Sequence, residues 1–422
     1  MKIANFADLH LNKATHGRVM DRIQVHLPFR TVDFMNAFGF GVDKCINEIK
    51  PDLVTILGDV YETFDPSNEV RAFFHSQIKK FIDNKIPVLI ILGNHDICSK
   101  HHALLPLKEL GLKNIKVIEE PCIVPFKDVD IMAFPYPIEV VQKKKTIREA
   151  FNDFQAIIEK RDTSRQGILL GHCGVIGAKM NEYYDTIITD EMETTSTTTL
   201  DPVAKEIVNR GVHDIYMSDL KSTGANYVFL GHFHKHQILN TPGCVSMYVG
   251  SMEKTDMSER DQEKGFVVYD TESPETETMG KCSIIKYNNC RPMIELKGNL
   301  NHMRSSIDKY HPDQYKDALI KLHFVGSKNE LIDFSTGIDV IKDELNKRFN
   351  PIHIYSLQTV INPEEKHQVA IIEKEIAEHG QIDAVAILSA ASDMIAERIT
   401  DEEEMNATID LAKEIQKEVE EE

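Results

Sequence analysis

The chain has 422 residues and a formal net charge of −19, from 48 basic and 67 acidic side chains. This length exceeds what one ordinary hydrophobic core fills, so we expect two or three domains. The hydrophobic content of 42% excludes an extended disordered chain. No apolar run approaches the roughly 18 residues that a membrane-spanning helix needs, so we expect no membrane partner.

The negative charge is concentrated at the C-terminal end of the chain. Residues 361–422 hold 18 acidic and 5 basic side chains, a net charge of −13. Residues 281–360 hold 12 basic and 9 acidic side chains and are net basic, at +3, which leaves −9 for residues 1–280. An acidic total argues against a nucleic acid as partner, but this distribution leaves that partner open. The tail itself is expected to repel nucleic acid or to bind a protein.

The sequence also predicts the compartment. Its N-terminal segment reaches the carboxylate of Asp8 too early for a signal peptide. Seven scattered cysteines include no C-x-x-C pair, which is typical of reduced thiols. We therefore expect a cytoplasmic protein, or a viral protein in the host cytoplasm.

Short apolar runs in residues 1–280 predict β-strands. They are rich in β-branched and aromatic residues, and most end at Gly or Asp. Helix-like stretches separate the early runs, which favours an α/β fold whose sheet is covered on both faces. In open α/β sheets, ligands bind at the carboxyl ends of the strands. The expected strands are residues 3–7, 53–57, 88–92, 129–134, 168–170, 227–230, 245–249 and 266–269.

A change of composition predicts where the first domain ends. Residues 271–278 are rich in Ser, Thr, Glu and Pro, which is typical of a connection. Residues 283–360 then show the pattern strand, loop, strand, helix, strand. We expect the strands at 293–296, 319–324 and 352–357, and the helix at about 337–348. The predicted domains are residues 1–280, 281–360 and 361–422.

The third region carries an apolar stripe at helical spacing. Its members recur every three or four residues, as on one face of an amphipathic helix. Such a face either docks a partner or packs on its own chain, and both alternatives stay open. The stripe consists of Met405, Ile409, Ala412, Ile415 and Val419.

Five strand ends carry residue types that bind metals. Each alone is common in loops, and Gly-Asp after a strand is often only a turn. The ordered set, with every member at the end of an apolar strand, predicts one site because loops at one sheet edge converge in space. The five are Asp8-Leu9-His10, Gly58-Asp59, Gly93-Asn94-His95-Asp96, Gly171-His172 and Gly231-His232-Phe233-His234.

The residue types indicate two divalent cations. Such a pair needs one bridging carboxylate and several single ligands, with positions left open for water. Carboxylate, imidazole and carboxamide ligands without thiolates suit Mn²⁺, Fe²⁺ or Zn²⁺ better than Ca²⁺. His232 and His234 alternate along an extended segment and so point the same way, which lets each serve one metal. A centre of this kind activates a bound water and clamps a phosphoryl group.

In this order, the motifs D-x-H, G-D, G-N-H-D, G-H and G-H-x-H resemble those of the calcineurin-like metallophosphoesterases. The resemblance implies a two-sheet α/β sandwich flanked by helices. It further implies that His95 stabilises the transition state or protonates the leaving oxygen, and that Asp96 orients His95. An alternative for Asp96 is a helix N-cap. The implied ligands are Asp8, His10 and His234 for one metal, Asn94, His172 and His232 for the other, and Asp59 as the bridge.

Three further stretches resemble the SbcD family of DNA nucleases. They are G-D-V-Y-E-T-F-D-P at 58–66, with Glu62 where Asp is usual, G-S-M-E at 250–253 and K-G-F at 264–266. The resemblance implies two manganese ions, or Fe, Zn or Mg in their place. It implies 3′→5′ exonuclease action on duplex DNA and endonuclease action on single strands and hairpins, in double-strand-break repair or recombination. It also implies a small α/β capping domain that binds DNA, a homodimer and a partner SMC-like ABC-ATPase, SbcC.

Two other functions stay open beside the nuclease. One is a phosphodiesterase or protein phosphatase with a substrate other than DNA, although the arginine-rich block of Ser/Thr phosphatases is absent from the sequence. The other is a non-catalytic scaffold of a repair complex, against which the filled ligand positions count. The sequence has no G-x-x-x-x-G-K-[ST] loop, so any ATP is expected to be hydrolysed by a partner.

Overall fold

The computed structural model describes residues 1–13, 19–22, 25–98, 101–176, 178 and 215–360. The apolar stripe of the tail therefore lies outside the described residues. The chain divides into two compact units. Unit 1 comprises Met1–Ile294, Pro312–Ile320 and Phe349–His353, and unit 2 comprises Glu295–His311, Lys321–Arg348 and the chain from Ile354.

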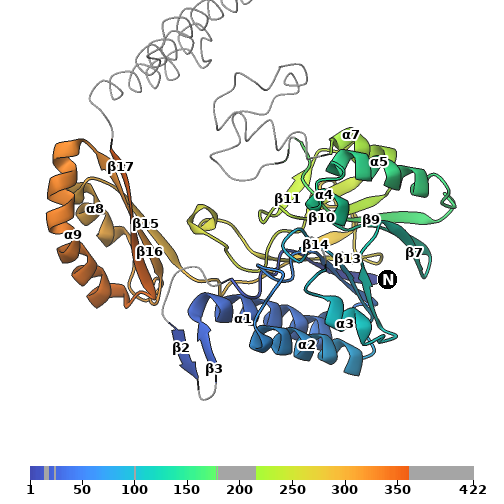
Figure 1. Cartoon of the computed structure of the whole chain (residues 1–422), viewed down its shortest axis with the longest axis horizontal. Helices are drawn as coiled ribbons and strands as arrows, with labels where there is room; N and C mark the ends of the chain where they lie inside the picture. Colours follow the sequence, from blue (N-terminus) through green and yellow to red (C-terminus); the bar gives the residue numbers. More distant parts are fainter. Residues whose placement is uncertain (14–18, 23–24, 99–100, 177, 179–214, 361–422) are drawn as a thin grey trace, which may run out of the picture. The chain divides into compact units, whose positions relative to one another are not determined.

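Unit 1 is built on two six-stranded sheets (Figure 1). The first sheet has the order β14-β13-β1-β4-β5-β6, and the second has the order β11-β12-β10-β9-β8-β7. In the first sheet the strands are β1 (Lys2–Phe6), β4 (Leu53–Leu57), β5 (Val88–Ile91), β6 (Ile115–Ile118), β13 (Gly265–Asp270) and β14 (Cys282–Lys286). In the second they are β7 (Cys122–Phe126), β8 (Val129–Phe134), β9 (Gln166–His172), β10 (Tyr227–Gly231), β11 (Gln237–Leu239) and β12 (Val245–Tyr248).

The apolar runs become strands that are buried on both faces. Alternate side chains of a strand point to opposite sides, so Ala4 and Phe6 of β1 pack toward the helices while Ile3 packs toward the second sheet. The strands β1, β4, β5 and β6 are parallel neighbours, and so are β8, β9, β10 and β12. Parallel strands covered on both sides explain the nearly continuous apolar runs of the sequence.

Helices cover the outer face of each sheet (Figure 1). On the first sheet, Phe38 and Phe74 pack in one buried cluster with Phe6. On the second, the rings of Phe151 and Phe154 contact Phe134. The predicted α/β sandwich flanked by helices is thereby confirmed. The helices are α1 (Phe29–Lys44), which continues into η1 (Cys45–Ile49), α2 (Asn68–Asp83), α3 (Leu105–Glu109), α4 (Ile138–Val141), α5 (Ile147–Ile158) and α7 (Met217–Ser222), with a short η3 (Met257–Glu259).

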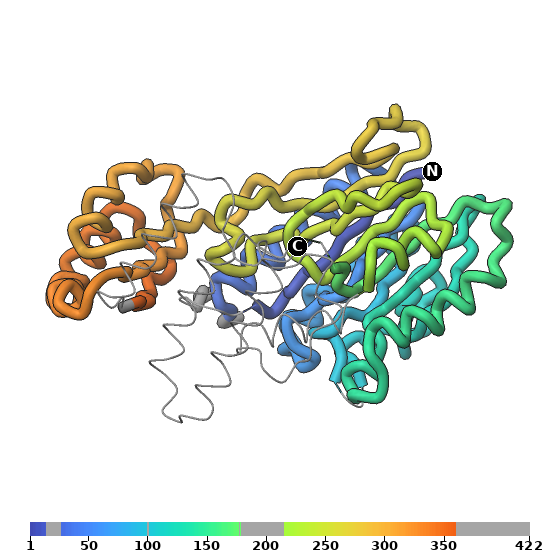
Figure 2. Tube along the Cα trace, turned by 90° about the horizontal axis from the view of Figure 1, so that it is seen from above, coloured from blue at the N-terminus to red at the C-terminus, as the bar shows by residue number. Residues whose placement is uncertain are grey.

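Several strands lie where the sequence predicted none. They are β6, β7, β11, β14 and the hairpin of β2 (Val19–Arg22) and β3 (Val25–Pro28). The Ser, Thr, Glu and Pro-rich stretch at 271–278 connects β13 to β14, which pair antiparallel in the first sheet. The N-terminus lies beside this connection (Figure 2), where the backbone N–H of Thr271 donates to the Met1 carbonyl at 2.9 Å.

The C-terminal part of the described chain forms a three-stranded sheet, β15-β16-β17, with helices α8 and α9 on one face (Figure 1). At Gly337 of α9, a Cβ atom would lie only 2.4 Å from the side chain of Leu300 in α8, so the glycine permits close packing of the two helices. The elements are β15 (Met293–Gly298), α8 (Leu300–Ser306), η4 (Ile307–Lys309), β16 (Leu319–Gly326), α9 (Lys328–Phe349) and β17 (His353–Val360).

Two expectations for this part are corrected. Helix α9 begins at Lys328 rather than near residue 337, because Ser327 and Glu330 form a capping box. Helix α8 occupies part of the stretch that the sequence predicted as loop, and Asn299 caps it by accepting from the backbone N–H of His302. Among the described residues, no helix is long and apolar enough to cross a membrane.

Buried charges tie α1 to two later segments within unit 1. Arg30, which is fully buried, contacts Asp33 at 2.8 Å and Glu253 at 3.6 Å. The side chain of Arg291 donates to Asp33 from Nε at 2.9 Å, and its backbone N–H donates to Glu253 at 3.2 Å. Each buried charge thus has a partner of opposite sign, as a buried charge requires.

Replacement of Gly58 in unit 1 would strain the backbone. Gly58 has a φ of +80°, and a Cβ there would lie 2.3 Å from Nδ1 of His172 and 2.8 Å from Cα of Gly93. We expect Gly58→Ala to lower the free energy of unfolding by about 1–3 kcal/mol, the usual cost of forcing a residue other than glycine into the left-handed region. Urea denaturation monitored by circular dichroism measures this.

Gly39 in α1 provides the matched control, because a Cβ there meets no atom within 4 Å. Gly39→Ala should raise the free energy of unfolding by about 0.5–1 kcal/mol, since alanine is the better helix former. Equal effects of the two substitutions would contradict the close approach at Gly58.

Candidate metal centre at the ends of the two sheets

The residues predicted to bind metal follow strands of both sheets. In the first sheet, Asp8 and His10 come after β1, Asp59 after β4 and Asn94 after β5. In the second, His172 ends β9, and His232 and His234 come after β10. The two sheets are joined at these ends, because Nδ1 of His172 donates to the carbonyl of Leu57 at 2.7 Å.

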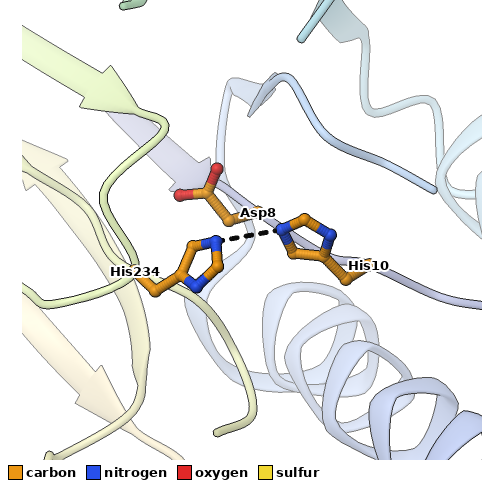
Figure 3. A group of neighbouring side chains, drawn as sticks. All are labelled: Asp8, His10 and His234. Carbon is orange, nitrogen blue, oxygen red and sulfur yellow. Dashed lines mark hydrogen bonds between the residues drawn. The ribbon is translucent and has the colours of Figure 1, made fainter. Parts of the chain in front are cut away.

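Asp8, His10 and His234 form one cluster (Figure 3). Nε2 of His10 and Nε2 of His234 lie 3.1 Å apart, with the Asp8 carboxylate beside them. One oxygen of Asp8 accepts from the backbone N–H of His232 at 2.9 Å, while its buried Oδ2 has no hydrogen-bond partner. Two facing imidazole nitrogens and an unpaired carboxylate oxygen fit a divalent cation.

Asp59, His172 and His232 form a second cluster. The carboxamide oxygen of Asn94 lies 3.1 Å from both Nε2 of His172 and Nδ1 of His232. Oδ2 of Asp59 lies 3.3 Å from Nε2 of His172 and 3.9 Å from Nε2 of His10. Asp59 therefore contacts both clusters, as a bridging carboxylate must.

The backbone is strained at four of these residues. Asp8, His10, Asp59 and His232 have φ values of 51°, 42°, 48° and 102°, in the region that residues other than glycine rarely adopt. Such strain collects at functional sites, where the surrounding structure holds it in place. Close packing of the loops contributes, since a Cβ on Gly93 would lie 2.2 Å from the backbone nitrogen of Asp59.

Burial and mutual contact shift the protonation of the buried groups. Burial raises the pKa of the Asp8 carboxyl. Burial would also raise the pKa of Asp59, but the imidazoles of His172 and His10 outweigh it and hold that pKa well below its usual range. Burial disfavours the charged form of His172, yet Asp59 raises its pKa to about 9. Burial and the neighbouring His172 lower the pKa of His232 to about 3. Burial and the neighbouring charges thus shift the pKa values of these groups in opposite directions.

His95 stands at the solvent edge of this site. Its ring centre lies 5.1 Å from that of His10. Its backbone N–H donates to Asp59 at 2.9 Å, and Nδ1 donates to the carbonyl of Glu62 at 2.8 Å. These contacts fix the ring and leave Nε2 as the nitrogen able to meet a substrate.

In the structure, Asp96 does not contact the ring of His95 as we expected, but bonds to the backbone. Its buried carboxylate accepts from the backbone N–H of Gly93 at 3.0 Å and of Tyr61 at 3.1 Å, while the ring of His95 bonds to Glu62 instead. Ile97, which directly follows Asp96, pairs with His102 in an isolated β-bridge, so no helix begins at Asp96 and Asp96 is no N-cap. Asp96 therefore ties together the two loops that carry Asp59 and Asn94.

Three residues of the site were missed from the sequence. Glu62 contacts His10 through Oε2, at 2.8 Å from Nδ1. Glu259 accepts from Nδ1 of His234 at 2.9 Å, and the buried Lys264 donates to Glu259 at 2.6 Å. In the sequence, the only signal at position 62 is a Glu where the SbcD family usually has Asp, and the only signal at position 264 is the K-G-F motif. Position 259 carried no signal.

Three other described histidines have partners of their own. Among those described, His102 contacts Glu119, His236 bonds to the Val249 carbonyl and His101 contacts Cys98. None of these belongs to either cluster. His213 lies outside the described residues.

The two facing sheets and the site at their strand ends define a class, the metal-dependent phosphoesterases. Residues 1–236 match the model of the calcineurin-like phosphoesterases, and the chain belongs to this family. It is accordingly a phosphodiester hydrolase, and its fold implies divalent metal ions.

Three individual proteins that match this chain share at most a quarter of their aligned residues with it. The SbcD component of the nuclease SbcCD from Staphylococcus epidermidis is 25% identical over 284 residues, which cover 65% of this chain and 67% of the relative. The phosphopantetheinyl hydrolase PptH of Mycobacterium tuberculosis matches 60% of this chain and 90% of its own, at 11% identity and a TM-score of 0.34. GAP50, the anchor in the inner membrane complex of Plasmodium, matches 69% of this chain and 90% of its own, at 12% identity and a TM-score of 0.35.

The position of Asp96 gives a prediction about stability. Asp96→Asn leaves one acceptor oxygen for two backbone donors, so we expect the free energy of unfolding to fall by about 1–3 kcal/mol. Asp65→Asn is the control, because Asp65 is exposed and pairs with Arg71 at the surface; its effect should stay within about 0.5 kcal/mol. Chemical denaturation measures both. Equal stabilities would show that Asp96 does not hold the two loops.

Proposed function

We propose that this chain is a manganese-dependent DNA nuclease of the SbcD type. The observation that carries the proposal is the convergence of seven metal-ligand residue types from the strand ends of both sheets. The choice of DNA rests on the similarity to a component of a nuclease and on the SbcD-like motifs at 58–66, 250–253 and 264–266. The activities proposed are 3′→5′ exonuclease action on duplex DNA and endonuclease action on single strands and hairpins.

The seven residues divide into ligands of two manganese ions. Asp8, His10 and His234 would hold the first. Asn94, His172 and His232 would hold the second, with Asp59 shared between them. When bound, two such ions lower the pKa of a coordinated water and neutralise charge on the scissile phosphate.

His95 and Asp96 have separate parts in this proposal. His95 is the acid, because its ring is fixed through Nδ1 and, once protonated, its Nε2 can donate to the leaving oxygen. Asp96 acts through the backbone, by holding the loops of Asp59 and Asn94 in register. The buried carboxylate of Asp59 anchors the backbone of His95 and so fixes its distance from the ligands.

The remaining parts of the chain have proposed roles as well. Residues 1–280 would be the nuclease domain, 281–360 a capping domain that holds duplex DNA, and 361–422 a tail that docks the partner. The net charge of +3 in 281–360 supports phosphate contacts there. The proposed assembly is a cytoplasmic homodimer with an SbcC-like ATPase, acting in double-strand-break repair or recombination. Nothing in the comparisons favours the viral alternative.

A second candidate is a phosphodiesterase whose substrate is not DNA. The family as a whole supports this candidate equally, since its common feature is the metal centre rather than the substrate. A direct cleavage assay distinguishes the DNA nuclease from this second candidate. The substrates are linear duplex, single-stranded and hairpin DNA, tested with Mn²⁺ and with or without the ATPase. Cleavage of a chromogenic phosphodiester without any cleavage of DNA would favour the second candidate.

The role of His95 gives the decisive substitution. His95→Ala should lower the rate of DNA degradation by at least about 100-fold, the usual contribution of a general acid, because the substitution removes the ring proposed to protonate the leaving oxygen. Gel assays on labelled DNA give the rate, and calorimetric titration with Mn²⁺ should show unchanged metal binding.

His75→Ala is the control, since His75 lies on α2 outside both clusters. It should degrade DNA at the wild-type rate. Equal rates for His95→Ala and His75→Ala would remove His95 from the mechanism while leaving the metal centre intact.

A further inference from the structure

Two histidines of the first cluster are backed by carboxylates. His10 and His234 face one another through Nε2, at 3.1 Å. On the opposite side of each ring, Nδ1 of His10 lies 2.8 Å from Oε2 of Glu62, and Nδ1 of His234 lies 2.9 Å from Oε1 of Glu259. A carboxylate thus lies behind both rings, but only Glu259 forms a hydrogen bond with its ring, whereas Glu62 contacts His10 without one.

Each of these glutamates is paired with a lysine. Nζ of Lys13 lies 2.6 Å from Oε1 of Glu62, and Nζ of Lys264 lies 2.6 Å from Oε2 of Glu259. The Lys264 side chain is only 1% exposed and also donates to Ser251 and to the carbonyl of His234. Each lysine thus holds its glutamate in place beside the histidine ring.

At His234, the Glu259 carboxylate accepts the hydrogen bond from Nδ1, so the imidazole hydrogen lies on that nitrogen. The lone pair of Nε2 then points toward the metal position. A carboxylate behind a ligand histidine also makes the ring more basic and fixes its orientation. Both effects strengthen the first position.

The histidines of the second cluster are held differently. His172 donates from Nδ1 to the carbonyl of Leu57, which is a neutral acceptor. His232 turns Nδ1 toward Asn94, at 3.1 Å, and so faces the metal position with that nitrogen. The second position therefore depends on neutral neighbours and on the shared Asp59.

We propose that the Glu62–Lys13 and Glu259–Lys264 pairs are positioning residues that make the first metal position the tighter of the two. The first position is the one formed by Asp8, His10 and His234, and it fills before the second. This inference rests on the proposed function, which assigns the seven ligands to two metals.

The test compares two buried glutamates. Glu259 contacts His234, whereas Glu253 is equally buried but pairs with Arg30. The full-length wild type and the variants Glu259→Gln and Glu253→Gln are titrated with Mn²⁺, and the free ion is measured by electron paramagnetic resonance. The wild type should show one tight and one weaker site. Glu259→Gln should weaken the tight site by roughly ten- to hundredfold, while Glu253→Gln should keep both affinities.

Two more variants identify which position is tight. His172→Ala should lose the weaker site and keep the tight one. Glu62→Gln should weaken the same site as Glu259→Gln. Circular dichroism shows whether Glu259→Gln folds, and if it does not, Glu62→Gln serves as the test variant.

The outcomes separate this inference from the proposed function. Wild-type affinities for both sites in Glu259→Gln and Glu62→Gln would overturn the inference, and so would loss of the tight site in His172→Ala. In both cases the wild type would still bind two manganese ions, and the proposed function would stand. A wild type that binds fewer than two manganese ions would overturn the proposed function itself.

Discussion

The hydrogen bond from His172 to the carbonyl of Leu57 joins the ends of the two sheets, and the site depends on it. It leads from β9 of the second sheet to the last residue of β4, next to the loop that carries Asp59. Space at this junction is so restricted that a Cβ on Gly231 would lie 2.1 Å from the same carbonyl oxygen. Side chains from both sheets can meet around Asp59 only because the strand ends approach this closely.

The same closeness makes the charged groups of the site costly to bury. Asp8, Asp59 and His172 are withdrawn from water, and burial disfavours the charged form of each. The left-handed backbone at Asp8 and Asp59 adds strain to this cost. The surrounding core and the contacts between the strand ends keep these groups in place, so the folded sheets form the site in advance. A preformed arrangement of this kind leaves little reorganisation for ligand binding.

Much of the sandwich and the convergence of the polar strand-end residues were predictable from the sequence, because buried parallel strands appear as apolar runs and their ends carry the polar residues. The edge strands β7 and β11 were missed because their residues are partly exposed and lack that signal. The start of α9 was missed because Gly337 interrupts the helical pattern, although Leu300 explains the glycine. The contacts of Asp96, Glu62 and Glu259 depend on how distant loops pack, which motif spacing does not encode.

The wide separation of the site residues along the chain has a consequence for folding. Asp8 and His234 are neighbours in space but 226 residues apart in sequence, and β1 pairs with β13 near residue 270. Contacts between residues so far apart in the sequence form late in folding, since the entropic cost of closing long loops must first be overcome. A nascent chain in which β10 has not yet been synthesised contains Asp8, Asp59 and Asn94 but lacks the two histidines that follow β10. Uptake of metal at this centre therefore marks a chain whose two sheets have already come together.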